Sequence, residues 1–166
     1  MRFIAALILF LSPLSALAQT PTLLEQFSDW EAYRYEGQDG NVTCYLLSKP
    51  KTLAPPDRNH GDVFFFLTTR PAEEVTHEAS VLVGYPFAPD SNVVVDIDGQ
   101  EFQLFTKDDG AWVESPADEA QLLVAMRAGS RMTVRGTSAR GTETSYTFSL
   151  SGVTAGSNRI ASGCDA

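Results

Sequence analysis

The stretch AWVESPADEAQLLVAMRAGSRMTVRGTSARGTETSYTFSL, residues 111–150, decides the predicted fold. Its apolar residues recur first at the spacing of a helix and then at the two-residue spacing of strands. Ser115 is a suitable N-cap, Pro116 suits the first helical position, and Asp118 completes a weak capping box. Gly129 follows the last expected turn as a C-cap. We therefore predict one helix, of about three turns, between Ser115 and Gly129.

The predicted helix has one apolar face, and such a face needs a surface to cover. The residues that form this face at helical spacing are Ala120, Leu123, Val124 and Arg127, with Leu122 and Met126 widening it. Everything before the helix has the pattern of strands and turns. The helix should therefore pack on a sheet.

Two strands are expected after the helix. Polar Arg131, Thr133 and Arg135 alternate with apolar residues, and a second alternation runs through residues 144–150. Alternation of this kind gives a sheet one wet and one buried face, which is typical of antiparallel sheets. The glycine-rich segment 136–141 between the two strands should form a loop.

The chain before the helix consists of short apolar or alternating runs separated by turn residues. The runs expected to be strands are 27–36, 42–48, 62–70, 79–85, 92–98 and 100–106. The continuous apolar run 62–70 indicates a strand buried on both faces, and Asp98-Gly99 is a strong two-residue hairpin signal. Segment 49–61 is expected to be a loop, and the tail from residue 152 is small and polar. We predict a mainly β protein, an antiparallel β-sandwich or barrel-like sheet with one short α-helix packed on it.

The N-terminus has the pattern of a secretory signal peptide. A short positive region at Arg2 precedes the apolar run 3–11, and Ala16-Leu17-Ala18 matches a cleavage signal. We predict cleavage after Ala18, leaving residues 19–166 as a single exported domain, periplasmic or secreted. No later run is long enough to span a bilayer.

Charge and cysteine content narrow the class of protein further. Loss of Arg2, the one charged residue in 1–18, would change the formal net charge from −9 to −10. A chain this acidic should repel nucleic acid and anionic lipid. Its two cysteines, Cys44 and Cys164, lie in the exported part, and in an oxidising compartment an even pair predicts a disulfide.

The sequence offers weak signals for catalytic or metal chemistry. His60 and His77 are the only histidines, and they lack the close ligand spacing of a metal site, so we expect ordinary surface residues. Residues 96–101 lack the frame of a calcium loop and are expected to form a plain hairpin. We predict no metal and no cofactor.

An enzymatic alternative has two candidate starting points. Ser138 lies in a glycine-flanked loop, but the spacing and the flanking strands differ from those of a nucleophile elbow. Asp96 and Asp98 could act as an acid pair. Only two histidines are available to act as a base, so we expect neither arrangement to be catalytic and assign no catalytic residues.

Two groups of residues are candidates for a binding surface. Arg131, Arg135 and Arg140 could form a positive stripe that holds a carboxylate or phosphate, or they could pair with the abundant acids. Tyr85 and Phe87, beside Gly84 and Pro86, could form an exposed aromatic contact or the edge of the core.

The ordered set of these motifs resembles the invasion-associated locus B family of exported alphaproteobacterial proteins. The segments that carry the resemblance are 27–30, Cys44, 84–86, 96–99, 126–129, 138–142 and 149–153. The resemblance implies a β-rich periplasmic or secreted protein with a structural disulfide, and some members are linked to host-cell invasion. Other members have further cysteines where this chain has Tyr33, Tyr35 and Ala111, so their disulfide pattern does not transfer. The family supplies no catalytic residues.

Together these observations favour a non-enzymatic module that binds a protein partner in the envelope or on a host cell. A small periplasmic hydrolase and an envelope-folding accessory are the alternatives. No nucleic-acid partner is expected.

Overall fold

The computed structural model describes residues 20–164, and the expected signal peptide lies outside them. Eleven strands form one sheet in the order β1-β2-β3-β5-β6-β9-β8-β7-β10-β11-β4. The strands are β1 Thr22–Phe27, β2 Trp30–Glu36, β3 Val42–Ser48, β4 Thr52–Ala54, β5 Phe64–Arg70, β6 Val75–Leu82, β7 Asn92–Ile97, β8 Gln100–Lys107, β9 Gly110–Val113, β10 Arg131–Thr137 and β11 Glu143–Ser149. A short 3-10 helix, η1 Pro71–Glu73, and two α-helices, α1 Pro116–Ala128 and α2 Val153–Gly163, complete the chain.

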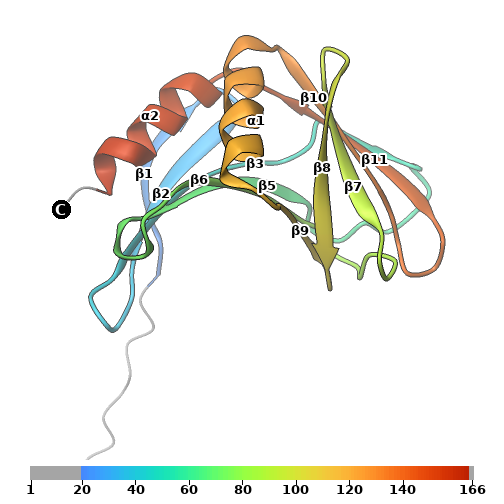
Figure 1. Ribbon diagram of the computed structural model, residues 1–166, viewed down its shortest axis with the longest axis horizontal. Helices are drawn as coiled ribbons and strands as arrows, with labels where there is room; N and C mark the ends of the chain where they lie inside the picture. Colours follow the sequence, from blue (N-terminus) through green and yellow to red (C-terminus); the bar gives the residue numbers. More distant parts are fainter. Residues whose placement is uncertain (1–19, 165–166) are drawn as a thin grey trace, which may run out of the picture.

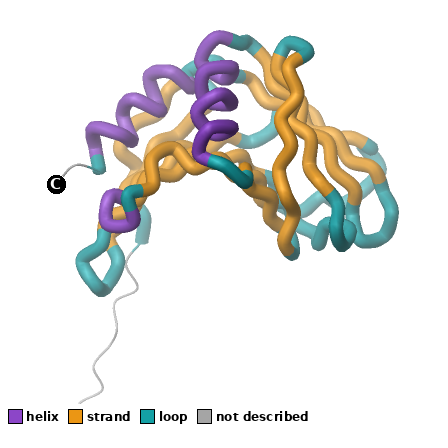
Figure 2. The backbone as a smooth tube through the Cα atoms, in the orientation of Figure 1, coloured by secondary structure: helices purple, strands orange, loops and turns teal. Residues whose placement is uncertain are grey.

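Every neighbouring pair of strands runs antiparallel, and the sheet is not closed, because β1 and β4 form its two edges. The sheet curves into an arch, and both helices lie on the same side of it (Figures 1 and 2). The prediction of a mainly antiparallel, sandwich-like β fold is confirmed. No helix within residues 20–164 has the length and apolar character needed to cross a membrane.

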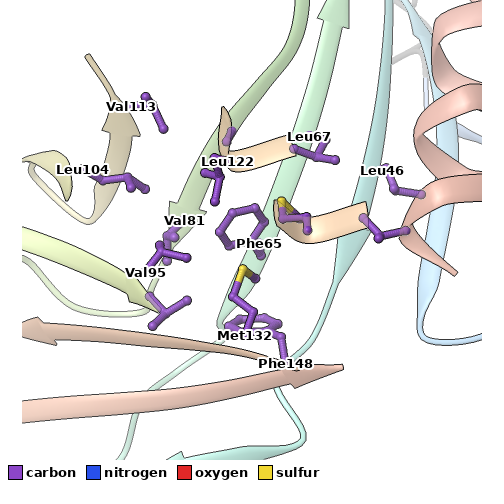
Figure 3. Close-up of a cluster of buried hydrophobic side chains, with 14 of the residues drawn as sticks. Leu46, Phe65, Leu67, Val81, Val95, Leu104, Val113, Leu122, Met132 and Phe148 are labelled. Carbon is purple, nitrogen blue, oxygen red and sulfur yellow. The ribbon is translucent and has the colours of Figure 1, made fainter. Parts of the chain in front are cut away.

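The curvature brings two parts of the sheet together around one hydrophobic core. Phe65 of β5 and Phe148 of β11 meet edge to face with ring centroids 5.9 Å apart. Met132 of β10 and Val95 of β7 lie beside them, and Leu122 of α1 approaches from the helix side (Figure 3). The core is therefore shared by distant strands and by α1.

Helix α1 begins and ends where the sequence predicts, but its buried face differs. The backbone N–H of Asp118 donates to Ser115 Oγ at 3.1 Å, as a capping residue requires. Leu122 and Met126 are fully buried, whereas Val124, which the sequence pattern places on the apolar face, is 67% exposed. Leu123 and Ala125 are partly buried against the core, so the covered face of α1 is centred on Leu122 and Met126 and leaves Val124 outside it.

The prediction of one helix is wrong, because the tail forms a second helix. Val153, Gly156, Ser157 and Ile160 are the buried residues of α2. These residues recur at helical spacing, but Gly156 and Ser157 are not large apolar residues, so the sequence of this segment shows no apolar stripe. A Cβ at position 156 would lie 2.9 Å from Leu46 Cδ2, so the glycine permits close packing of α2 on β3.

A disulfide joins the end of α2 to the sheet. Cys44 of β3 and Cys164 have Cα atoms 5.7 Å apart and close a loop across 120 positions of sequence. The predicted pairing is confirmed. The bond holds the C-terminal helix against the strand on which it packs.

Other differences concern strands. The expected strand 27–36 begins only at Trp30, as β2, after a turn at Ser28, where φ is +52°, and a further strand, β1, precedes that turn. The expected loop 49–61 contains the short strand β4. Strand β5 is not buried on both faces, because its residues alternate between buried and half-buried. Its outward Phe66 packs beside Tyr45, which explains why the run is apolar throughout.

The hairpin at Asp98-Gly99 is confirmed. Strands β7 and β8 pair on either side of it, and both turn residues have positive φ, +53° and +87°. These values match the tight turn that an Asp-Gly pair favours.

Candidate functional site

Three connections between strands meet around a hollow of about 580 Å³, which we call the loop-end pocket. They are residues 55–63 between β4 and β5, 83–91 between β6 and β7, and 138–142 between β10 and β11. The residues that line the pocket are Asp57, Arg58, Asn59, His60, Gly84, Tyr85, Pro86, Ser138, Ala139, Arg140, Thr142 and Thr144. The volume suits a small molecule or the end of a larger one.

Two glycines fix the position of the first two connections. The backbone N–H of Gly84 donates to the carbonyl of His60 at 3.1 Å. A Cβ at position 84 would lie 2.6 Å from both Gly61 Cα and the His60 carbonyl oxygen. The backbones can therefore cross only because both positions lack a side chain. This crossing places His60 and Tyr85 at one pocket wall.

A chain of hydrogen bonds joins three residues that line the pocket, His60, Tyr85 and Thr144. Nδ1 of His60 lies 2.9 Å from the Tyr146 hydroxyl, which lies 2.7 Å from the Tyr85 hydroxyl. Tyr85 in turn lies 2.7 Å from Thr144 Oγ1, and Thr144 donates to the carbonyl of Gly136 at 3.0 Å. The hydrogen-bond chain therefore links β11 to two of the three connections.

The second ring nitrogen of His60 is also bonded. Nε2 of His60 donates to the Pro55 carbonyl at 2.9 Å, because a carbonyl can only accept. Both ring nitrogens of His60 therefore have partners within the protein.

Burial, and then the hydrogen bond with Tyr85, raise the pKa of the Tyr146 phenol. The phenol therefore stays neutral.

The arrangement does not place a base beside Ser138. Its Oγ accepts from the backbone N–H of Thr142 at 3.1 Å, and the residue is 7% exposed. His60 lines the same pocket, but its two ring nitrogens are bonded to Tyr146 and Pro55. A serine nucleophile needs a base within hydrogen-bond reach, and this histidine points elsewhere.

Asp96 and Asp98 do not belong to the loop-end pocket. Asp96 lies in β7 opposite Glu101 of β8, and Asp98 is in the turn between the two strands. Neither residue is among those that line the pocket. The acid pair therefore lies on a hairpin.

The predicted binding residues divide between two places. Tyr85 and Arg140 line the pocket together. Arg131 and Arg135 lie on the outward face of β10, where Arg135 Nη2 is 2.6 Å from Glu101 Oε1. The three arginines therefore do not form one stripe. Phe87 is 6% exposed and packs edge to face on Tyr85, so of the two alternatives it forms the edge of the core.

Neither histidine is an ordinary surface residue. His60 is 6% exposed, and His77 is half-buried with Nε2 2.8 Å from the Ser157 carbonyl. Burial lowers the pKa of His77, the hydrogen bond opposes this, and the nearby Arg127 lowers it further. Within residues 20–164, no three His, Cys, Asp or Glu side chains gather in an arrangement able to hold a metal ion.

Three residues of the site are not predicted from the sequence. Arg58 and Asn59 line the pocket, and Tyr146 is bonded to the lining residue His60. The segment containing the first two has the pattern of a plain loop, and its only signal is a polar run before Gly61. Tyr146 lies 86 positions from its partner His60, so no local pattern could reveal their contact.

Comparisons with known proteins agree with this fold. No curated protein matches the chain. A solved structure, described as the crystal structure of invasion associated protein b from Bartonella henselae, is similar with a TM-score of 0.59 and 15% identity. The match covers 85% of this chain and 97% of that one, and at this identity it shows the fold alone. The family model for the Invasion associated locus B (IalB) protein matches residues 30–161. The chain belongs to the invasion associated locus B family.

Proposed function

We propose that this protein is exported to the periplasm or beyond the cell and acts there as a non-enzymatic binding module. Its partner is a protein of the envelope or of a host-cell surface, and its binding surface is the rim of the loop-end pocket, with Arg140 and Tyr85. The Cys44–Cys164 disulfide and the family support export, because such bonds persist outside the cytoplasm.

One observation carries the choice of a binding role. The buried polar groups of the pocket are bonded to one another, as the chain from His60 through Tyr146 and Tyr85 shows. A catalytic group needs a free atom facing its substrate. Here the network ties two of the three connections to β11, and loops held on a rigid scaffold are common binding surfaces.

The partner can be identified by crosslinking in the producing cells, with and without host cells. Tagged wild-type protein should capture a specific envelope or host protein. The Arg140→Ala variant should lose it, whereas Arg131→Ala should retain it. Both arginines are exposed and neither forms an ion pair within residues 20–164. Loss only in Arg131→Ala would move the binding surface to β10, and no partner above background would contradict the binding role.

Export is tested separately by mass spectrometry of the protein recovered outside the cytoplasm. We expect the mature chain to begin at Gln19. Recovery with an intact N-terminus would contradict the proposed cleavage.

A further inference from the structure

We propose that the loop-end pocket binds a small organic anion, through its carboxylate or phosphate group, between Arg58 and Arg140. This inference rests on the proposed function for its site and names the ligand chemistry of that site. Nothing in the family description assigns a ligand to this pocket.

The first support is the state of the two arginines. Both are exposed, they come from different connections, and they line the same pocket. Four other arginines, Arg34, Arg70, Arg135 and Arg159, pair with carboxylates, whereas Arg58 and Arg140 have no such partner within residues 20–164. In a chain with a formal net charge of −9, two unpaired arginines at one hollow favour an anionic ligand.

The second support is the charge balance of the pocket. Asp57 is the one carboxylate among its lining residues, so the two arginines leave an excess of positive charge. Tyr146 beside the pocket does not offset that excess, because burial raises the pKa of its phenol. A carboxylate or phosphate would offset this charge.

The third support is that the remaining polar groups are donors. Asn59 Oδ1 accepts from the backbone N–H of Gly61 at 3.0 Å, which leaves the amide NH₂ of Asn59 without an acceptor in the described part of the chain. Ser138 Oγ accepts from Thr142, and its own proton has no acceptor there either. Guanidinium, amide and hydroxyl donors match the acceptors of a carboxylate or phosphate.

The size of the pocket distinguishes an organic anion from a simple ion. A hollow of about 580 Å³ is many times the volume of a water molecule and falls in the range of small-molecule sites. Bidentate contact from an arginine on each side would hold one charged group and leave room for the rest of the ligand.

The test is a titration of the mature protein followed by backbone amide NMR, with three probes that differ in one group. D-Glucuronate carries a carboxylate, glucose 6-phosphate carries a phosphate, and glucose is the neutral control. We expect one or both anions to shift the amides of residues 57–60 and 138–142, and glucose to leave them unchanged. The probe that binds more tightly identifies which of the two groups the pocket prefers.

Three variants locate the site. Arg58→Ala and Arg140→Ala should each weaken binding by about tenfold or more, because each removes a charge-assisted contact. Arg131→Ala removes the same charge from β10 and should change the affinity less than about twofold. All three residues are exposed, so thermal unfolding should be unaffected and will show that each variant is folded.

Equal shifts with glucose, no shift with either anion, or equal weakening by Arg131→Ala would overturn the proposal. The outcome is separate from that of the proposed function. If the anions bind but the crosslinking captures no partner, only the protein-binding role is contradicted. If a partner is captured by the wild type and lost in Arg140→Ala, but neither anion binds, only this inference is contradicted.

Discussion

Two regions of this protein are stabilised in different ways. At the C-terminal helix, α2 is held on β3 by close packing of Gly156 on Leu46 and by the Cys44–Cys164 disulfide. At the loop-end pocket, hydrogen bonds and the Gly84 backbone crossing hold three connections around an open space. The first region buries its surface and leaves no room for a ligand. The second satisfies its buried polar groups internally and leaves charged groups at the rim.

The two histidines show the same contrast. His77 lies near α2, bonded to the Ser157 carbonyl and close to Arg127, so burial disfavours its charged form. His60 lines the pocket, where Nδ1 is bonded to the Tyr146 hydroxyl and Nε2 to the Pro55 carbonyl. The same residue type is thus kept neutral by burial in one region and bridges two elements by hydrogen bonds in the other.

Removing the disulfide should lower the free energy of unfolding more than any other change, and it should act on the region of α2 and not on the pocket. The double variant Cys44→Ala/Cys164→Ala frees a loop spanning 120 positions, and we expect the free energy of unfolding to fall by about 4 kcal/mol. Urea unfolding measures the loss. The pocket should still bind its ligand while the chain is folded. A loss below about 1 kcal/mol would show that packing of α2 alone holds this region.

The next effect concerns the helix that covers the core. Leu122→Ala should lower the free energy of unfolding by about 2–5 kcal/mol, because the side chain is fully buried. Val124→Ala, two positions away and exposed, should change it by less than about 0.5 kcal/mol. Denaturant titration of both variants decides between the observed buried face and the one predicted from the sequence. Similar losses would support the latter.

Features with local signals could be predicted from the sequence. The Ser115 cap depends on a contact with Asp118, three residues away, and the hairpin depends on the two turn residues Asp98 and Gly99. Residue type alone therefore indicates both features. Helix α2 could not be predicted in this way, because its buried face contains glycine and serine. It is stabilised by contact with Leu46 and by a bond to Cys44, both more than 100 positions distant.

The candidate site could be predicted only in part. Residue type alone indicates Tyr85 and Arg140, and the structure brings them together. Arg58 and Asn59 give no such signal, because a pocket built from three connections has no sequence period. The sequence leaves two alternatives for Phe87, because an aromatic residue beside a turn can face either way, and here it packs against Tyr85 at the edge of the core.

A smaller effect is expected from closing the space at the backbone crossing. Gly84→Ala should lower the free energy of unfolding by about 1–3 kcal/mol, because its Cβ meets the backbone of Gly61 and His60. It should also weaken anion binding. Gly37→Ala is a matched control, because its Cβ meets mainly the exposed Asp39 side chain. Unfolding and NMR titration of both variants test whether the crossing shapes the pocket. Equal behaviour of the two variants would contradict that role.

The smallest effect is the pH dependence due to His77. Burial, together with Arg127, lowers its pKa below the ordinary value of 6.5, so the unfolded chain binds a proton before the folded one does. Stability from this residue is complete above about pH 6.5 and is lost as the pH falls toward the lowered folded value. His77→Asn removes the titrating group while tolerating the positive φ of +59° at this position.

The measurement is the free energy of unfolding of wild-type and His77→Asn protein between about pH 7.5 and pH 5.5. The wild type should lose more stability over this range, because all other titrating groups are common to both proteins. Parallel curves would mean that His77 is as easily protonated in the folded state as in the unfolded one. The contrast between a histidine kept neutral by burial beside α2 and one that bridges two elements at the pocket would then lose its first member.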